Sequence, residues 1–575
     1  MASAPDRWPV LRAAVRQAAL ELAAFGRRLL RLPGRVRMPV RILFAPRDLR
    51  VADPGAAQDM AAGIYVFGDR TMRIGATSPF AVQPPSAEWA EELYGFGWLR
   101  HLRLSETGEA QDLARRLVGE ALGPLRRNLD RFPAREPRVA ARRVASLLAH
   151  SPLLLSGASP ALYRRYLMAL GRDAARLDRS MRDAPVPADR LSAAIGLCLA
   201  SLCCEGLERR LSRVTRVLSA ELDAQVLADG GHVGRNPGTC LDLLQDLLPL
   251  RLLFATRSVP IPAALDRAID RLSPMLRFFR HGSGDLALFN GMGRTPLADL
   301  AVLLSLDRER GAPALHAAWS GYDRMEAGGT VVLAETGAAP PLAASAGAHA
   351  GCLSFELSRG ESRLVVNCGA PPGRGPARDA ARLTAAHSTL VMGGEPSGRA
   401  LPVGGPAGLG WAERFLWGRL GPVLVTGPRA VGAERGITVD GDVILSAHHD
   451  GYLRGFGATH ERRLRLSADG RELAGADTLR LSQDGTAASA LLRFHLHPSA
   501  TVVAEPEGEI RIQGSAGDVW LFDAQGAAGA PRLEGSVFFA VSEGRRATRQ
   551  IVLDLPTAGP GDRLTLRWRF RLLAG

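Results

Sequence analysis

The hydrophobic pattern of the chain changes once, near Gly321, and this change constrains the fold more than any other feature. Before Gly321, apolar residues recur at intervals of three and four, which is typical of amphipathic helices. After it, short runs rich in β-branched residues alternate with glycine-containing turns, which is typical of antiparallel strands. A chain of 575 residues is too long for one core, so the pattern predicts a helical domain followed by a β domain.

Several stretches of the first half carry the helical pattern, and prolines fall near their starts, where the missing N–H costs little. Short loops join these stretches, so they should pair as antiparallel hairpins in a bundle, a solenoid or a toroid. No fixed-period repeat is visible, which disfavours a repeat solenoid. The predicted helices span residues 110–125, 138–148, 160–177, 189–208, 211–226, 240–255, 263–279 and 296–308.

The second half contains many short strand-like runs, and their number and spacing predict an antiparallel β-sandwich. One longer stretch, residues 369–386, is rich in Gly, Pro and Arg and is predicted to be a functional loop or a surface excursion. The predicted strands span residues 330–334, 352–357, 363–367, 388–392, 423–426, 443–448, 462–466, 489–495, 519–523, 535–541, 549–553 and 563–570.

The formal charge of +14 says little about the partners of the chain. The sequence contains no lysine, so all 72 basic residues are arginine, and glycine (63) and proline (38) are also abundant. That composition is typical of a GC-rich genome, which raises arginine content regardless of function. A basic surface favours acidic ligands in general, such as acidic polysaccharide or anionic lipid. No basic segment interleaved with aromatics and no nucleic-acid module occurs, so we expect no nucleic-acid partner.

The cysteines and the N-terminal segment bear on the compartment. None of the six cysteines forms a CxxC pair, and the first three, Cys198, Cys203 and Cys204, lie in an apolar helical stretch and are predicted to be buried free thiols. A reducing compartment is therefore allowed. Residues 8–32 are basic and amphipathic without a continuous apolar region, so we predict no signal peptide and a cytoplasmic location. No run reaches the ~18–20 apolar residues of a membrane span. The segment is expected to pack on the domain or lie as a surface tail, with an interfacial membrane helix as the alternative. The oligomeric state stays open.

The first group of residues that could carry chemistry is the glycine-rich turn 229–237, between two predicted helices. His232 could move a proton near neutral pH, and Arg235 could clamp a carboxylate with a two-pronged hydrogen bond. Asn236 adds an amide to the same turn. The structural alternative is a capped turn in which Asn236 holds the next helix and His232 is satisfied locally.

The second group is formed by His349, Asn367 and His387. A predicted hairpin brings His349 back toward Asn367, and His387 opens the next strand. Two imidazoles and an amide oxygen could hold a divalent metal, most plausibly zinc. The alternative is two unrelated surface histidines beside a loop.

The third group lies in residues 446–463 and includes His448, His449, Tyr452 and His460. A histidine, tyrosine and arginine cluster suits acid–base work on an anionic sugar, and Tyr452 is the candidate for that role. The alternative is a polar strand ending in a β-turn at residues 450–451. The sequence shows no phosphate-binding loop, no GxSxG elbow and no HExxH motif.

At these residues the chain resembles the heparinase II/III family of polysaccharide lyases. The resemblance covers most of the chain from about residue 90 onward and is clearest in the second half. It implies an incomplete (α/α) toroid followed by an antiparallel β-sandwich, with a helical or irregular segment at residues 1–85, the toroid at 86–315 and the sandwich at 316–575. The matching segments are 98–99, 229–232, 320–322, 349, 354–357, 367–369 and 386–389.

The resemblance also implies an activity: β-elimination on an acidic, uronate-containing polysaccharide at the junction of the two domains. Such chemistry needs a group that neutralises the uronate carboxylate, a base for the C5 proton and an acid for the leaving oxygen. On that basis Trp98, Arg190 and Tyr322 are expected to contact the substrate. A zinc ion in the β domain would be structural, and the location would be the cell envelope or periplasm.

The sequence departs from the family pattern at several positions. Thr239 stands where the family has a tyrosine, Asp189-Arg190 where an Asn-His pair is common, Gly347 where a second histidine is frequent, and Asn367 where a metal ligand Asp is usual. Two hypotheses follow. Either the lyase chemistry is rebuilt, or the protein is a non-catalytic glycan-binding or envelope-assembly protein on the same scaffold. A glycoside hydrolase is the least favoured alternative. A rebuilt lyase would rely on His232, Arg235, Asn236 and Tyr452 as catalytic residues.

Overall fold

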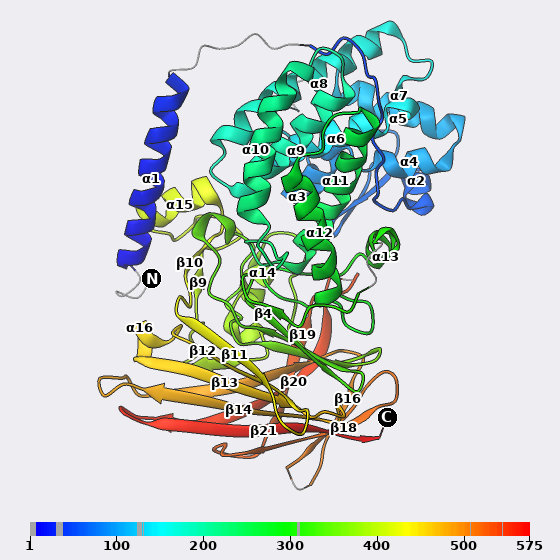
Figure 1. Ribbon diagram of the computed structural model, residues 1–575. Coiled ribbons are helices and arrows are strands. Elements are labelled where there is room, and N and C mark those ends of the chain that lie inside the picture. Colours follow the sequence, from blue (N-terminus) through cyan, green and yellow to red (C-terminus); the bar gives the residue numbers. More distant parts are fainter. Residues whose placement is uncertain are drawn as a thin grey trace.

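Helices fill the upper half of the molecule and two β-sheets fill the lower half (Figure 1). The computed structural model describes residues 7–29, 38–123, 129, 132–307, 311–506, 508–542 and 544–574. This order of elements confirms the predicted succession of a helical toroid and an antiparallel β domain. The helices of the upper half are α2 (Pro54–Ala61), α3 (Ala87–Gly95), α4 (Leu99–Ser105), α5 (Gly108–Ala121), α6 (Pro137–Ala149), α7 (Ser151–Leu155), α8 (Pro160–Asp183), α9 (Pro187–Cys203), α10 (Leu211–Gln225), α11 (Pro237–Thr256), α12 (Ala263–Phe278) and α13 (Leu297–Leu306).

Local sequence explains where these helices start and which one is central. Thr107 and Ser159 cap α5 and α8 by accepting hydrogen bonds from the backbone N–H groups of Ala110 and Leu162. Helix α9 is apolar on nearly every face, and it packs between α6, α8 and α10. A helix that is hydrophobic all round belongs inside a domain, so α9 forms the centre of the helical core.

The segment before residue 86 belongs to the helical half. A short hairpin of β1 (Ile64–Phe67) and β2 (Arg70–Arg73) follows α2, and Phe67 lies 5.1 Å from Trp89 of α3, centroid to centroid. Both side chains are buried in the helical core. The hairpin therefore extends that core.

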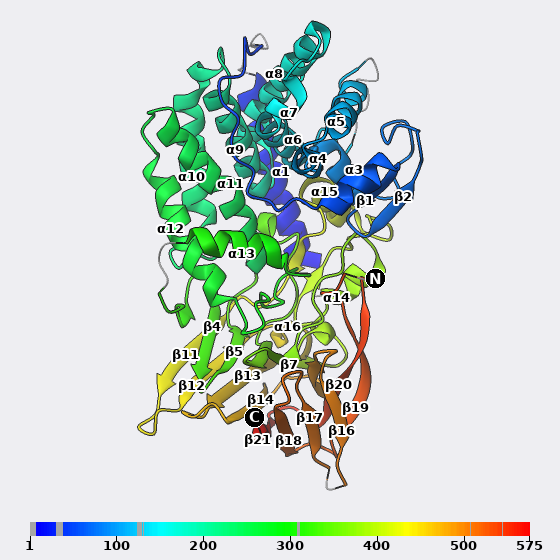
Figure 2. The ribbon, with the colours of Figure 1, turned by 90° about the vertical axis from the view of Figure 1, so that its right-hand side faces the viewer.

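The N-terminal helix α1 (Arg7–Leu29) stands to one side of the helical bundle, level with the helical half and its junction with the β domain (Figures 1 and 2). Its buried residues Val10 and Ala14 share a small core with Leu416 and Leu420 of α15 (Trp411–Leu420). The expectation that this segment packs on the folded domain is confirmed for the described residues.

The opposite face of α1 is exposed. Trp8, Val15 and Leu22 are 68%, 59% and 72% exposed, and Arg12 and Arg16 lie among them. This face combines large apolar and basic side chains, which is the pattern of an interfacial helix. Among the described residues no helix is both long enough and apolar enough to span a membrane.

The lower half consists of two antiparallel sheets. One has the order β19-β20-β15-β7-β6-β5-β4-β3, with β8 paired to β15, and the other has the order β11-β12-β13-β14-β21-β18-β17-β16. The predicted strands are confirmed, whereas β3, β4, β11, β14, β16 and β17 were not predicted. The strands are β3 (His316–Ala317), β4 (Tyr322–Ala327), β5 (Thr330–Glu335), β6 (Phe355–Arg359), β7 (Ser362–Val366), β8 (Leu390–Met392), β11 (Val431–Ile437), β12 (Val443–His449), β13 (Ala458–Leu466), β14 (Glu472–Leu481), β15 (Ala488–Leu496), β16 (Thr501–Ala504), β17 (Ile510–Gln513), β18 (Val519–Gln525), β19 (Arg532–Phe538), β20 (Arg546–Ala558) and β21 (Arg563–Ala574).

The two sheets enclose one apolar core. Phe355 of the first sheet stacks on Trp568 of the second, with ring centroids 5.4 Å apart and planes 5° apart. Phe494 packs edge-on against the same tryptophan. Aromatic contacts of this kind between facing sheets define the sandwich. The sheets are linked through the irregular stretch 367–430, which contains α14 (Pro376–Ala381), β9 (Arg399–Ala400), α15 and β10 (Leu424–Thr426).

Candidate functional site

The glycine-rich turn between α10 and α11 lies at the base of the helical half and contacts the first strands of the β domain. Asp229 anchors it, because one carboxylate oxygen accepts from the Gly231 N–H at 2.9 Å and the other accepts from the Ser320 N–H at 2.6 Å. Gly231 has no room for a side chain, since a Cβ there would lie 2.3 Å from the Cβ of Ser320. The turn is therefore a fixed joint between the two halves.

His232 is held inside this turn. Its Nδ1 accepts a hydrogen bond from the Gly234 N–H at 3.0 Å, and its Nε2 lies 3.4 Å from the Gln225 Oε1. A ring nitrogen that accepts from an amide carries no proton, so Nε2 is the donor. Burial lowers the pKa of His232 to about 4. The imidazole is thus neutral and satisfied locally, as the structural alternative required.

Arg235 crosses from the helical half into the β domain, as expected, and four of its five N–H groups are used there. It donates to the backbone carbonyls of Ser320, Gly321, Gly337 and Ala338 over 2.6–2.9 Å. These bonds use Nε and both terminal nitrogens. A guanidinium held in this way ties two loops together, and the one N–H that has no hydrogen bond within the described residues cannot form a two-pronged clamp on a substrate carboxylate.

The phenol of Tyr322 completes the same joint. Its hydroxyl donates to the Arg235 carbonyl at 2.6 Å and accepts from the Asn290 Nδ2 at 2.8 Å. The same amide nitrogen donates to Glu335 at 2.9 Å, and Glu335 lies 3.3 Å from Arg235. Burial raises the pKa of Tyr322 well above its usual value. A phenol with both hydrogen-bonding functions used and a raised pKa is a poor base.

The other residues expected to serve the substrate are also used internally. Asn236 caps α11 by accepting from the Gly238 N–H at 2.8 Å. Trp98 is 3% exposed and donates to the Leu93 carbonyl at 2.9 Å, and Arg190 pairs with Glu221 at 2.6 Å. None of these three contacts leaves the helical half.

The interpretation of Tyr452 as an acid–base group on the cleft requires correction. The side chain is 2% exposed in the sandwich core, and its hydroxyl donates to the Leu390 carbonyl at 2.7 Å. The neighbouring His449 contacts His460 at 3.3 Å, and His460 contacts Asp477 at 2.7 Å, all of them buried. Alternation along β12 and β13 turns His449 and His460 into the sandwich and leaves His448 exposed on the other face, so the buried part of the third group is a structural network.

His349 and His387 meet as predicted, with Nδ1 of the first 3.1 Å from Nε2 of the second. The His387 Nδ1 lies 2.8 Å from the Leu383 carbonyl and must donate to it, so its Nε2 accepts from His349. Burial lowers the pKa of His349 well below its usual value and that of His387 to about 4. Both rings are therefore neutral at pH 7 and satisfy each other.

Asn367 does not complete a metal site with this pair. Its Oδ1 accepts from the Ser388 N–H at 3.0 Å, and its buried Nδ2, which cannot ligate a metal, has no partner among the described residues. Within the same part of the chain no group of three His, Cys, Asp or Glu side chains is placed to hold a metal. Two neutral imidazoles without an anionic ligand fit a structural zinc site poorly, so we expect any zinc at this pair to bind weakly.

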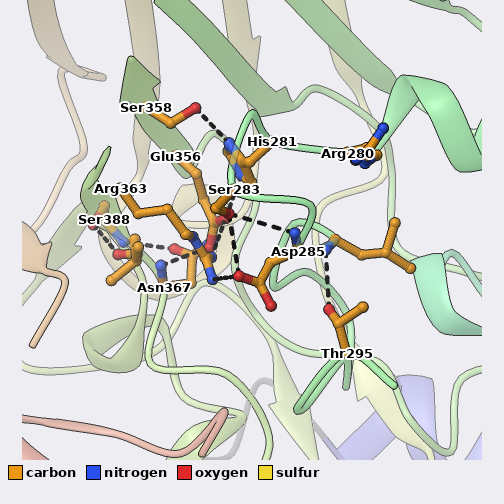
Figure 3. A network of polar contacts seen from close by, with 12 residues as sticks. Arg280, His281, Ser283, Asp285, Thr295, Glu356, Ser358, Arg363, Asn367 and Ser388 are labelled. Atoms are coloured by element: carbon orange, nitrogen blue, oxygen red, sulfur yellow. Dashed lines mark hydrogen bonds and ion pairs between the residues drawn. The ribbon is translucent and has the colours of Figure 1, made fainter. Parts of the chain in front are cut away.

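A buried polar network that was not predicted joins the loop after α12 to strands β6 and β7 (Figure 3). Glu356 of β6 contacts His281 at 2.9 Å and Arg363 of β7 at 3.0 Å, and its other oxygen accepts from the Asn367 N–H at 2.9 Å. The His281 Nδ1 contacts Ser358 at 2.7 Å. This cluster fastens the loop after α12 to the first sheet. Arg363 lowers the pKa of Glu356 even though the carboxylate is fully buried.

The predicted loop 369–386 reaches across the junction. Arg374 pairs with Glu88 at 2.9 Å and with Glu91 at 3.0 Å, both on α3 of the helical half. Asp189, at the start of α9, belongs to the same acidic region, and burial raises the pKa of Asp189 and of Glu91. The carboxylates on the helical side of the junction are therefore paired, Glu88 and Glu91 with Arg374 of the β domain and Asp189 with Arg138 at 2.9 Å.

Comparisons with known proteins agree with this architecture. Residues 309–569 match the family model described as Heparinase II/III-like, C-terminal. FtsZ-localized protein C of Caulobacter vibrioides is 35% identical over 488 residues, which cover 83% of this chain and 81% of that protein.

Solved structures show the same fold at low sequence identity. Heparinase III superimposes with a TM-score of 0.69 at 12% identity, over 99% of this chain and 92% of that one. A mutant of the heparan sulfate lyase HepC from Pedobacter heparinus gives 0.60 at 14% identity, over 98% and 89%. At such identity the likeness concerns the fold, because one fold hosts many functions.

Proposed function

The chain belongs to the heparinase II/III-like family, and from that premise we propose that it is a non-catalytic envelope-assembly protein that localises with FtsZ. The relative of 35% identity carries that localisation in its name and aligns with four fifths of this chain. The lyase structures share the fold at 12–14% identity. On this proposal the protein has the fold of the lyases but does not cleave polysaccharide.

The observation that carries the proposal is the internal use of every residue expected to perform elimination. His232 is neutral and held by its own turn, and Arg235 donates to four backbone carbonyls. Tyr452 lies in the sandwich core. Releasing Arg235 for a substrate carboxylate would break several hydrogen bonds worth about 1 kcal/mol each and leave Glu335 without its cation.

Charge at the junction supports the same proposal. Glu88, Glu91 and Asp189 line the helical side, Arg374 is already paired with the first two, and Arg138 is paired with Asp189. An acidic polysaccharide that entered here would meet carboxylates and would have to displace Arg374. Like charges at contact distance are unfavourable, so the junction is poorly suited to that substrate.

Helix α1 supplies a means of attachment at the envelope. Its outward face carries Trp8, Val15 and Leu22 with Arg12 and Arg16, while its inward face is fixed to α15. Large apolar side chains can enter the acyl boundary of a bilayer while the arginines meet anionic headgroups. We assign this face to an anionic lipid surface.

A co-sedimentation assay with polymerised FtsZ tests the proposal. The purified chain should pellet with FtsZ polymers and stay in the supernatant without them. Recovery of the native chain in the supernatant at every FtsZ concentration would contradict the proposal.

A further inference from the structure

The outer face of the second sheet carries a groove that neither the lyase scaffold nor the proposed function explains. Strands β13, β14 and β21 lie side by side at the lower face of the molecule (Figure 1). A groove of about 390 Å³ follows β14 there. Its lining consists of Arg463, Arg465, Glu472, Ala474, Gly475, Ala476, Asp523, Gln525, Arg567, Trp568 and Arg569.

Strand register places the arginines in two rows. Ala476 of β14 pairs with Arg463 on one side and Arg567 on the other. Two residues away, Ala474 pairs with Arg465 and Arg569 in the same way. Each row therefore runs arginine, alanine, arginine across three strands. The small side chains of the alanines form the bottom of the groove, and the longer arginine side chains form its two sides.

Beneath the groove, Gly475 packs directly against the indole ring of Trp568. It lies opposite Trp568 in the register, and a Cβ at this position would come within 2.1 Å of the indole ring. The tryptophan is 2% exposed and faces the sandwich core. The groove is therefore a rigid surface over a packed core.

The two rows differ in charge balance. In the second row, Arg465 pairs with Glu472 at 2.8 Å and Arg569 pairs with Asp523 at 2.7 Å. In the first row, neither Arg463 nor Arg567 has a hydrogen bond or ion pair with any residue that the structure describes, and both are exposed. The flanking strands are roughly 9.6 Å apart, so both guanidiniums can reach one oxyanion held above Ala476.

We propose that this groove binds an extended acidic peptide segment, with one carboxylate held between Arg463 and Arg567. Successive rows are about 6.8 Å apart, which is also the distance between alternate side chains of an extended peptide. The second row is already neutralised by Glu472 and Asp523. A polymer with an acidic group on every unit would place its next carboxylate beside those two, whereas a peptide can present a neutral side chain there.

The proposal is tested by fluorescence anisotropy with a labelled peptide that has Glu at every fourth position and Ala elsewhere, so that an extended chain places a carboxylate at the first row and an alanine at the second. Arg463→Gln and Arg567→Gln should each weaken binding about tenfold, the loss of one charge-assisted contact. Ala476→Leu should weaken it by a similar factor without any change of charge, because the side chain fills the groove. The matched control is Arg480→Gln, which removes an arginine of β14 that is paired with Glu461; its affinity should change less than about twofold.

Three results would overturn the proposal. Equal weakening by Arg480→Gln would show diffuse attraction to a basic sheet. Unchanged binding in both Arg463→Gln and Arg567→Gln would remove the first row from the site. Binding of heparin with the same residue dependence, but no binding of the peptide, would assign the groove to an acidic glycan. Thermal unfolding of each variant verifies folding, and the two glutamine variants decide the matter if Ala476→Leu is unstable.

Discussion

The guanidinium of Arg235 lies over the ring of Tyr322, 4.9 Å from its centroid, while the Tyr322 hydroxyl donates to the Arg235 carbonyl at 2.6 Å. One residue comes from the helical half and the other from the first strand pair of the β domain. In a lyase these two side chains would be expected to face a sugar. Here they contact each other, and both side chains hold the helical half to the β domain instead of facing a substrate.

The first prediction concerns the energy of this joint. Arg235→Gln should lower the free energy of unfolding by about 3–5 kcal/mol, because it removes the cation beside buried Glu335 and several backbone contacts. Urea unfolding at pH 7 measures this change. Arg463→Gln, an exposed arginine without a partner among the described residues, should change stability by less than about 0.5 kcal/mol. Equal stability of the two variants would place Arg235 outside the joint.

The second prediction concerns the histidine pair. The native chain should gain little stability from zinc at pH 7.5, because His349 and His387 lack an anionic third ligand among the described residues. Asn367→Asp should be less stable than the native chain without metal, since it adds a buried carboxylate near Glu356. Zinc should then raise the melting temperature of that variant and leave the native one nearly unchanged. A large zinc-dependent shift in the native chain would contradict this account. The control is the double variant that combines Asn367→Asp with His387→Ala, which should lose the response to zinc.

Much of the fold follows from local sequence, because helix and strand periodicity and proline positions are local signals. The His349–His387 pair was also predictable, since a hairpin and a following strand bring the two positions together. Asn236 likewise acts as the helix cap that a turn of this kind favours.

Other parts of the site depend on contacts between distant segments. The residue spacing did not reveal that Arg235 meets the carbonyls of Gly337 and Ala338, about a hundred positions away. His281 and Glu356 were missed as a pair for the same reason. A signal was present, however: a carboxylate within an otherwise buried strand requires a cationic or hydrogen-bonding partner. Tyr452 was misplaced because a tyrosine after a turn can face either side of a sheet.

The third prediction concerns pH. Burial lowers the pKa of His232 and His387 to about 4, against about 6.5 in the unfolded chain. The unfolded state therefore binds more protons between these two pH values. The free energy of unfolding has its full value above pH 6.5 and decreases as the pH drops toward 4. Each of the two histidines should cost about 2 kcal/mol at pH 5. Urea midpoints measured from pH 7.5 to 4.5 should fall steeply, and a flat profile would show that these rings are accessible to protons in the native state.

The fourth prediction concerns the outward face of α1. The native chain should co-sediment with vesicles that contain anionic lipid, and more weakly as salt is raised. Trp8→Ser combined with Leu22→Ser should weaken this binding at least about tenfold, because the apolar contribution is lost. Trp319→Ser is the matched control, since that tryptophan is 72% exposed but lies on the turn before β4. Equal loss in the control would show non-specific adhesion, and full retention in the α1 variant would exclude this face.

The most direct test of the central claim is absorbance near 235 nm, which reports the unsaturated uronate that β-elimination produces. The purified native chain is incubated with heparan sulfate, chondroitin sulfate, hyaluronate and alginate, beside a known lyase as positive control. The account predicts no increase above the enzyme-free rate on any of these polymers, because His232, Arg235 and Tyr322 are already committed to one another and to the backbone. A steady increase that His232→Ala abolishes would contradict it and establish the protein as a lyase.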